Sequence, residues 1–569
     1  MTARNSQRPL NKVIAALLGL VVLYLISEVT LALGHQLFVW SQRAESAKAI
    51  SMSEDEIRIL VLGESTSAVA GLGKTDVLVK RTSYPSQLER RLNAETKDRK
   101  YVVINRANMG GDSARAVANI EDDMQRYRPH LVLAMIGMKD QGGPATGQEP
   151  SRFGLRTFRF IKLLLQDLNE RQTAESLNLG TQDVRIPASF FSQIDREFHF
   201  LNAYSPAERL SDEEFKQFKS AGTTVLYRLF TGDLGLATQL ALETVEKFNA
   251  GHALLASTYS MQGNSEQAEA VLREAIERFP NDTAYHAHLG SLLRDRDLYD
   301  EAEKVLKEGI KVQPENALLY YELALTYKSA GRYREGLSLL NDFLEKPDLL
   351  TRLESVNNKH FQTASRRNRA IIRNCRLLRA EFFYQLNELA EAERRLLRFL
   401  KHAYEYDAID LLSQIYRKKG QVQKERELRR QFAEKYPRLG EYYQLAKTLI
   451  RDGRKNEVPE LMQAAVRALP VTSASYRKLY ETVRGEGARL TYMQYPTFSL
   501  DLMMPFVPEE AKTDEGVSFI DNERVFDGLP TTDTFIEARY PYAFVHYTEK
   551  GAELLAEHIA KIIIKMFED

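Results

Sequence analysis

A serine that directly follows a strand-like run is placed where it could do chemistry. The apolar run at residues 57–62 ends at Gly63, and Glu64, Ser65, Thr66 and Ser67 come next. Open α/β sheets place their reactive groups just beyond the carboxyl ends of the strands, and a serine hydroxyl in that position can act as a nucleophile. A Gly-x-Ser turn is also common in ordinary loops. The pattern therefore predicts either a nucleophile at Ser65 or a simple turn.

The elements that would position Ser65 are predicted to form a parallel sheet. Strand-like runs occur at residues 57–62, 101–104, 131–136, 489–493 and 517–521. Helical patterns lie at 86–92 and 114–127, and an amphipathic helix is predicted at 552–566. Strands that alternate with helices predict one doubly wound α/β domain, with its first part at 55–170 and its second part at 475–569.

The middle of the chain repeats with a period of 34 residues. Pro280 and Pro314 have this spacing, and so do Leu255, Leu289 and Leu323. Small residues follow the same register at Ala268, Ala302 and Gly336. This pattern is typical of tetratricopeptide repeats, and it predicts an all-α solenoid of about six or seven helix pairs at 215–470, inserted into the sheet domain. Polar segments around 172–212 and 473–487 are expected to close the array.

The amino terminus is predicted to be a membrane anchor. Arg4, Arg8 and Lys12 precede an apolar stretch at 13–33 that contains Glu28, and about 21 apolar residues can cross a bilayer as a helix. The positive-inside rule then predicts a single-pass inner-membrane protein: residues 1–40 would form the cytoplasmic amino terminus and the transmembrane anchor, and the remainder would be extracytoplasmic or periplasmic. The alternative is a signal peptide cleaved near Gly34.

Composition excludes several classes of function. The chain has 569 residues, 78 basic and 78 acidic side chains, and a single cysteine. Because no basic block dominates, no nucleic-acid partner is expected. One cysteine excludes an intrachain disulfide framework. The ten histidines show no metal-ligand spacing, and there is no phosphate-binding glycine loop, so we expect neither a metal nor a cofactor.

Four blocks of the predicted sheet domain resemble those of the SGNH/GDSL hydrolases. They lie at residues 59–67, 103–113, 136–140 and 543–551, in the family's order. With its anchor and inserted repeats, the chain resembles the membrane-anchored, repeat-containing branch of that superfamily. The resemblance implies a flavodoxin-like sheet split by the solenoid.

The resemblance also implies roles for individual residues. Ser65 matches the nucleophile, His546 the general base, and the backbone N–H groups of Ser65 and Gly110 the oxyanion donors. Two positions depart from the family pattern: Lys139 stands where the family has an asparagine donor, and Ala543 where it has an aspartate. These departures put activity in doubt.

The role of Lys139 has two interpretations. The absence of an aspartate at position 543 also leaves open how His546 would be oriented. The Lys139 ammonium could stabilise the oxyanion, or it could face solvent or pair with a carboxylate such as Asp112 or Asp140. A backbone carbonyl could replace the aspartate, which would leave a Ser65–His546 dyad.

Two functions are therefore expected as alternatives. The first is a membrane-anchored serine esterase or acyltransferase, a hydrolase acting on ester-linked acyl groups, for example those of an envelope polysaccharide, with repeats that bind a partner or polymer. The second is a catalytically inactive SGNH-like protein that serves as a repeat scaffold for protein–protein interaction in the cell envelope.

Overall fold

The structure, a computed structural model, describes most of the chain beyond residue 55. The described ranges are 56–68, 70–71, 78–96, 99–107, 111–141, 212–231, 233–347, 349–350, 362–401, 405–535 and 546–568. None of the helices in these ranges is long and apolar enough to span a bilayer. The predicted anchor at residues 1–40 lies outside them.

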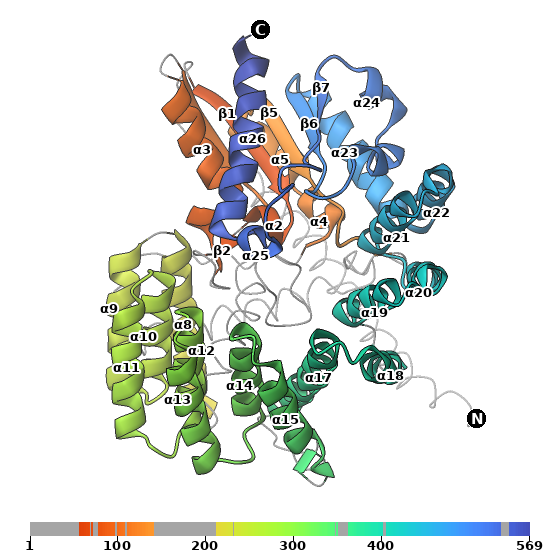
Figure 1. The fold of residues 1–569 in the computed structure, drawn as a ribbon. Coiled ribbons are helices and arrows are strands. Elements are labelled where there is room, and N and C mark those ends of the chain that lie inside the picture. The colour runs from red at the N-terminus through yellow and green to blue at the C-terminus, as the bar shows by residue number, and fades with distance from the viewer. Residues whose placement is uncertain are drawn as a thin grey trace, which may run out of the picture.

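A five-stranded parallel sheet forms the centre of the α/β domain (Figure 1). Its strands are β1 (Glu56–Gly63), β4 (Lys100–Asn105), β5 (Leu131–Met135), β6 (Arg489–Met493) and β7 (Val517–Ile520). They lie side by side in the order β4-β1-β5-β6-β7. Counted along the chain this order is 2-1-3-4-5, which is the flavodoxin-like arrangement of a doubly wound sheet. Each of the five predicted strands is therefore present.

The centre of the sheet is buried on both faces. Leu60 of β1 pairs with Ile104 of β4 and with Val132 of β5. All five residues of β5 are buried. A strand covered by helices on both sides needs apolar side chains at every position, which explains the continuous apolar runs in the sequence.

Helices cover both faces of the sheet. α3 (Tyr84–Glu95) leads from β1 to β4, whereas α5 (Ile120–Tyr127) leads back across β1 to β5. Because such crossovers are right-handed, α3 and α5 lie on opposite faces. The carboxyl-terminal helix α26 (Glu549–Glu568) packs beside α3, where Arg91 and Glu557 form an ion pair at 3.0 Å (Figure 1).

Helix boundaries in this domain differ from the predicted ones in one respect. The single helix expected at 114–127 is divided into α4 (Ser113–Ala116) and α5. The Asp112 side chain caps α4 by accepting from the Arg115 N–H at 2.9 Å, and Asn119 stands at the start of α5. The Asp112 cap explains where α4 begins, whereas the Asn119 side chain makes no cap hydrogen bond at α5.

Seven helix pairs follow one another in the described part of the solenoid. The first helices of the pairs are α8 (Asp212–Thr231), α10 (Gly251–Met261), α12 (Thr283–Asp295), α14 (Ala317–Ser329), α17 (Gln362–Gln385), α19 (Tyr406–Lys418) and α21 (Leu439–Arg451). The second helices are α9 (Leu234–Lys247), α11 (Ser265–Arg278), α13 (Tyr299–Val312), α15 (Tyr333–Leu344), α18 (Leu389–Leu400), α20 (Val422–Lys435) and α22 (Val458–Ala468). In Figure 1, α14, α17 and α19 lie on the inner side of the arc, and their partners α15, α18 and α20 lie on its outer side. We call the first helices inner and the second helices outer.

Inner and outer helices differ in burial. Every side chain of α12 from Tyr285 to Arg294 is buried, whereas α13 buries one stripe that includes Ala302 and Leu306. The packing is close, since a Cβ atom at Gly290 would stand 2.4 Å from Leu306 Cγ. The small residues of the repeat therefore allow neighbouring helices to approach each other.

The last repeats share one hydrophobic core with the sheet. Side chains of α21 and α22 belong to the same buried cluster as β1, β5 and β6. The N–H of Leu439, at the start of α21, donates to the Asp140 carbonyl oxygen at 3.1 Å. Gly137, with φ of 105°, passes so close to α21 that a Cβ there would stand 3.1 Å from Leu439 Cδ2. The solenoid is thus fixed to the loop after β5.

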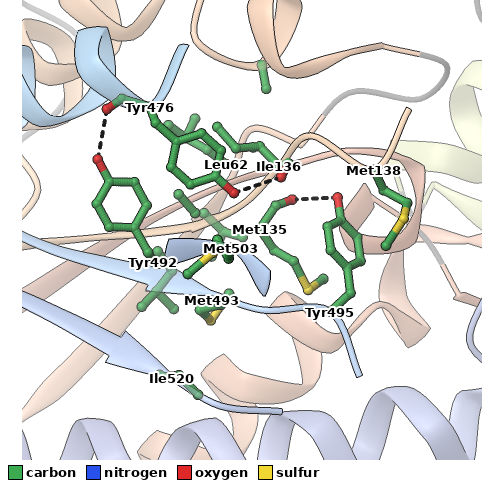
Figure 2. Close-up of a cluster of buried hydrophobic side chains, with 14 of the residues drawn as sticks. Leu62, Met135, Ile136, Met138, Tyr476, Tyr492, Met493, Tyr495, Met503 and Ile520 are labelled. Carbon is green, nitrogen blue, oxygen red and sulfur yellow. Dashed lines mark hydrogen bonds between the residues drawn. The ribbon is translucent and has the colours of Figure 1, made fainter. Parts of the chain in front are cut away.

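The segment predicted to be a polar closure at 473–487 is instead helix α23 (Pro470–Gly485). Tyr476, Leu479 and Val483 recur at helical spacing and are buried against the sheet. The Tyr476 hydroxyl donates to the Ile136 carbonyl at 3.1 Å, and the Tyr495 hydroxyl donates to the Met135 carbonyl at 3.1 Å (Figure 2). These bonds hold the carboxyl end of β5 in place.

Candidate functional site

The carboxyl end of β1 turns directly into the short helix α2 (Ser65–Ala68). The N–H groups of Ser67 and Ala68 donate to the Glu64 carbonyl at 3.0 and 3.1 Å. Gly63 makes this turn possible, because a Cβ atom at that position would stand 2.3 Å from Ser67 Oγ. Ser65 is therefore the first residue of a helix that begins at the carboxyl edge of the sheet.

Glu64 is a buried carboxyl group that the sequence analysis did not single out. It is 2% exposed, and its Oε1 accepts the Gly137 N–H at 2.8 Å and the Lys139 N–H at 3.5 Å. Burial, together with the nearby charge of Asp140, raises the pKa of Glu64 to about 8. The sequence feature that could have indicated a site role for Glu64 is its position between Gly63 and Ser65, at the end of a buried strand.

Lys139 lies in the turn after β5 and is half-buried. Its ammonium charge acts on Glu64, where it lowers the carboxyl pKa against the larger effect of burial. From the sequence, Lys139 was expected to face the oxyanion, solvent, or a carboxylate such as Asp112 or Asp140. Glu64 is thus a further carboxylate within reach of its charge.

Asp140 ties the loop after β5 to two helices. Its carboxylate accepts the Ser113 N–H at 2.7 Å, the Ser113 hydroxyl at 2.5 Å and the Thr472 hydroxyl at 2.6 Å. The Ser113 hydroxyl also contacts that of Ser475 at 2.9 Å. Burial raises the pKa of Asp140. These contacts indicate a positioning role for Asp140 between α4 and α23.

His546 is buried just before helix α26. The next residue, Tyr547, forms a β-bridge with Phe535, and the Thr548 N–H donates to the Thr534 carbonyl at 3.0 Å. A Cβ at Gly551 would stand 2.2 Å from the same carbonyl oxygen, so the two segments are in close contact. This packing fixes the backbone at His546.

The start of α26 lies at the same end of the sheet as the start of α2. Gln87, in the first turn of α3, donates from its amide to the Glu549 carbonyl at 3.0 Å, and α3 also contacts α2. Figure 1 shows α2 and α25 (Thr531–Thr534) together below the carboxyl ends of the strands. Ser65 and His546 therefore both belong to the α/β domain and lie at the carboxyl edge of its sheet. Gly110 and Ala543 lie outside the described residues, and the catalytic roles remain predictions.

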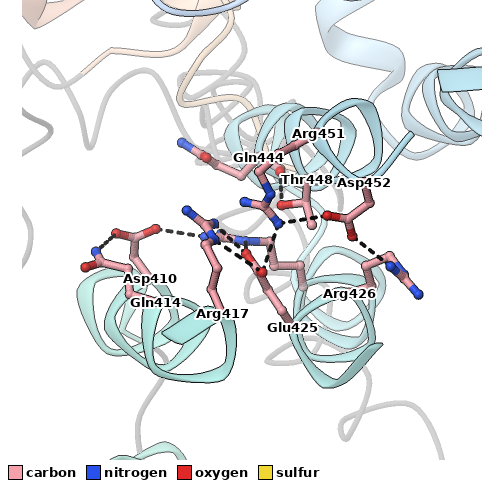
Figure 3. A network of polar contacts seen from close by, with 10 residues as sticks. Asp410, Gln414, Arg417, Glu425, Arg426, Gln444, Thr448, Arg451 and Asp452 are labelled. Atoms are coloured by element: carbon pink, nitrogen blue, oxygen red, sulfur yellow. Dashed lines mark hydrogen bonds and ion pairs between the residues drawn. The ribbon is translucent and has the colours of Figure 1, made fainter. Parts of the chain in front are cut away.

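A second polar cluster lies in the solenoid between α19 and α21 (Figure 3). Arg417, near the end of α19, and Arg451, the last residue of α21, both bind Glu425 of α20, at 2.6 and 2.9 Å. Glu425 is fully buried. On the same face lie half-buried Asp410, Gln414 and Gln444. Within the described ranges no group of three or more His, Cys, Asp or Glu side chains could hold a metal ion.

Comparison with known proteins bears on the solenoid. A profile of the tetratricopeptide repeat matches residues 254–317 and 289–348, which span α10 to α15. These residues are tetratricopeptide repeats. No curated protein sequence matches the chain.

Solved structures also match part of the chain. PilF of Pseudomonas aeruginosa is 16% identical over 38% of this chain and 91% of its own, with a TM-score of 0.28. PilW, a type IV pilus biogenesis factor, is 14% identical over 39% of this chain and 94% of its own, with a TM-score of 0.29. YrrB, described as a tetratricopeptide protein with an unusual peptide-binding site, is 13% identical over 36% of this chain and 96% of its own, with a TM-score of 0.24.

Proposed function

We propose that this protein is a repeat scaffold that binds a protein partner on the inner side of its solenoid. The tetratricopeptide match carries this proposal. Stacked helix pairs form extended concave surfaces that bind other proteins. Here the inner face of α19 and α21 presents half-buried or exposed polar side chains, among them Gln414, Arg417 and Arg451.

The α/β domain supports the scaffold in this proposal. Because α21 and α22 pack into the core of the sheet domain, the last repeats have a fixed position. A solenoid end normally needs a polar capping repeat, and the sheet domain takes that place.

Site-specific photo-crosslinking in cells tests the scaffold proposal. A benzoylphenylalanine replaces Gln414 on the inner face of α19 or, as the matched control, the exposed Gln431 on α20. We expect a discrete protein adduct from position 414 and none from position 431. Equal adduct patterns from both positions, or none from either, would contradict the proposal.

A second candidate is a serine esterase or acyltransferase of the SGNH/GDSL type. The observation that favours it is the common edge of Ser65 and His546 described above, in a sheet with strand order 2-1-3-4-5. Lys139 and Ala543, which replace the family's asparagine and aspartate, weigh against it. Its substrate would be an ester-linked acyl group, for example on a polysaccharide.

Active-site labelling tests this candidate. Under the esterase proposal a fluorophosphonate probe labels the native protein, and Ser65→Ala and His546→Ala each abolish the labelling. The same variants should lose hydrolysis of an aryl acetate. Equal labelling of all three proteins, or none of the native protein, would remove the esterase candidate and leave the scaffold proposal.

A further inference from the structure

We propose that the inner face between α19 and α21 binds a side-chain carboxylate of an acidic protein segment, which Arg417 and Arg451 hold above the buried charge of Arg429. This inference rests on the scaffold function and names the chemistry of the partner. Three observations support it: the charge balance of the contacting side chains, the burial of Arg429, and the exposure of Arg417 and Arg451.

The charge balance in the cluster favours an anion. Three guanidinium groups, those of Arg417, Arg429 and Arg451, contact two carboxylates, Glu425 and Asp410. Asp452 also approaches Arg451, at 3.3 Å, but it is paired with a further cation, Arg426, at 2.7 Å. The contacting groups therefore carry one positive charge more than they carry negative charges.

Charges of both signs surround these contacting groups. Lys447 of α21 adds a cation: burial, Arg417 and Arg429 lower its pKa, whereas the carboxylates of Glu523 and Asp410 raise it. Asp407, one turn earlier on α19, is the nearest further acid on that helix. Its pKa is raised to about 7 by burial and by neighbouring carboxylates, while Lys328 lowers it. Asp407 is therefore only partly charged at neutral pH.

Arg429 shows that the cluster has unused hydrogen-bonding capacity. Its side chain extends from the outer helix α20 and is only 3% exposed. Nη2 donates to Asp410 at 2.8 Å, whereas Nε is 3.9 Å from Glu425 Oε1. Among the described residues Nη1 has no hydrogen-bond partner. A buried cation without full pairing is costly, and a bound anion close above it would lower that cost.

Arg417 and Arg451 provide the contact surface. Their side chains are 46% and 37% exposed. Arg417 donates to Glu425 from Nη2 at 2.6 Å and from Nε at 3.5 Å, and Arg451 donates to it from Nη2 at 2.9 Å. Because both reach the same carboxylate, the two guanidinium groups lie close together (Figure 3). A planar guanidinium has five N–H donors, so each keeps donors for a second carboxylate on the solvent side. The site therefore suits one carboxylate bound between two arginines.

The occupant we infer is a peptide carboxylate, since the site lies on the inner face of a repeat array. The test measures binding of a fluorescent peptide with alternating Glu and Gly to the full chain by anisotropy, against the same peptide with Gln for Glu. The decisive variant is Arg417→Gln with Arg451→Gln. The matched control is Arg430→Gln with Arg454→Gln, which removes the same charge at exposed positions outside the cluster. Circular dichroism confirms that each variant is folded.

We expect the cluster variant to weaken binding of the Glu peptide about tenfold or more, and the control variant to change it less than about twofold. Equal losses in both variants, equal affinity for the Gln peptide, or binding of a polyuronate but not of the Glu peptide would overturn the inference. If position 414 still crosslinks a partner while the cluster variant binds the Glu peptide normally, the scaffold function stands and only the acidic-partner inference fails.

Discussion

Gly63 lies directly against Ser67. A Cβ atom at position 63 would stand 2.3 Å from Ser67 Oγ and 3.3 Å from the carbonyl oxygen of Met135. The glycine therefore decides how closely α2 follows the last residue of β1, and hence where the helix that begins with Ser65 lies. This local contact links the Gly63–Ser67 segment of the sequence to the geometry at the carboxyl edge of the sheet.

Gly63→Ala is expected to displace α2 and to lower the free energy of unfolding by about 1 to 3 kcal/mol, because overpacking of a tight site forces backbone shifts. Urea unfolding followed by circular dichroism measures the change. The control is Gly485→Ala in helix α23, where an added Cβ meets nothing within 4 Å. That variant should be neutral or slightly stabilising, and equal destabilisation of both variants would contradict the prediction.

Glu64→Gln is expected to reduce the pH dependence of stability on the alkaline side. Because the folded-state pKa of Glu64 is raised from 4.5 to about 8, the folded protein holds this proton more tightly than the unfolded chain does. The stability that this group contributes is present at low pH and is lost as the pH rises from 4.5 towards 8, by at most about 1.4 kcal/mol per pH unit. Thermal melts between about pH 5 and pH 9 should show a shallower decline for the variant. Parallel curves for both proteins would refute this.

His252 should make the solenoid sensitive to acid. It is 2% exposed, its ring contacts Phe279 and Tyr285, and burial lowers its pKa. The unfolded chain therefore binds this proton more readily, so stability falls as pH drops below about 6.5. His252→Phe keeps an aromatic ring and should lose less stability between about pH 7.5 and 5.5. A melting temperature as acid-sensitive as that of the native protein would argue against His252 as the cause.

Arg294 and Glu322 form a buried ion pair between α12 and α14, at 2.5 Å with 6% and 1% exposure. Arg294→Met leaves a buried carboxylate without its partner and should cost about 3 to 5 kcal/mol, whereas adding Glu322→Leu should restore much of that loss. A double-mutant cycle by chemical denaturation measures both effects. Additive losses in the double variant would show that the two side chains do not act as a pair.

Sequence patterns predicted much of this fold. The apolar runs of β1 and β5 lie within single strands, and the 34-residue spacing recurs from one repeat to the next, so strands and helix pairs could be predicted from them. The position of Ser65 at the start of α2 follows from the same strand end, although its role as a nucleophile remains a prediction.

Contacts between distant segments could not be predicted in this way. Asp140 accepts a hydrogen bond from Thr472, 332 residues later in the chain. The burial that raises the Glu64 pKa and the path of Arg429 toward α19 likewise depend on how helices meet in space. Residues 473–487, which include most of α23, were expected to be a polar closure, and only packing against the sheet shows the buried face that Tyr476, Leu479 and Val483 form.

The continuity of apolar packing from β5 into α21 and α22 has a mechanical consequence. Removal of the last repeats would uncover Met138, whose sulfur lies 3.3 Å from a Cβ built at Gly440 of α21, and removal of the sheet domain would uncover the Tyr443 ring, which packs on Phe498. Two architectures that look separable in sequence are therefore expected to unfold together at this junction, and a pull on the carboxyl-terminal repeats is expected to reach the Asp140 loop through the Leu439 N–H, which donates to the Asp140 carbonyl.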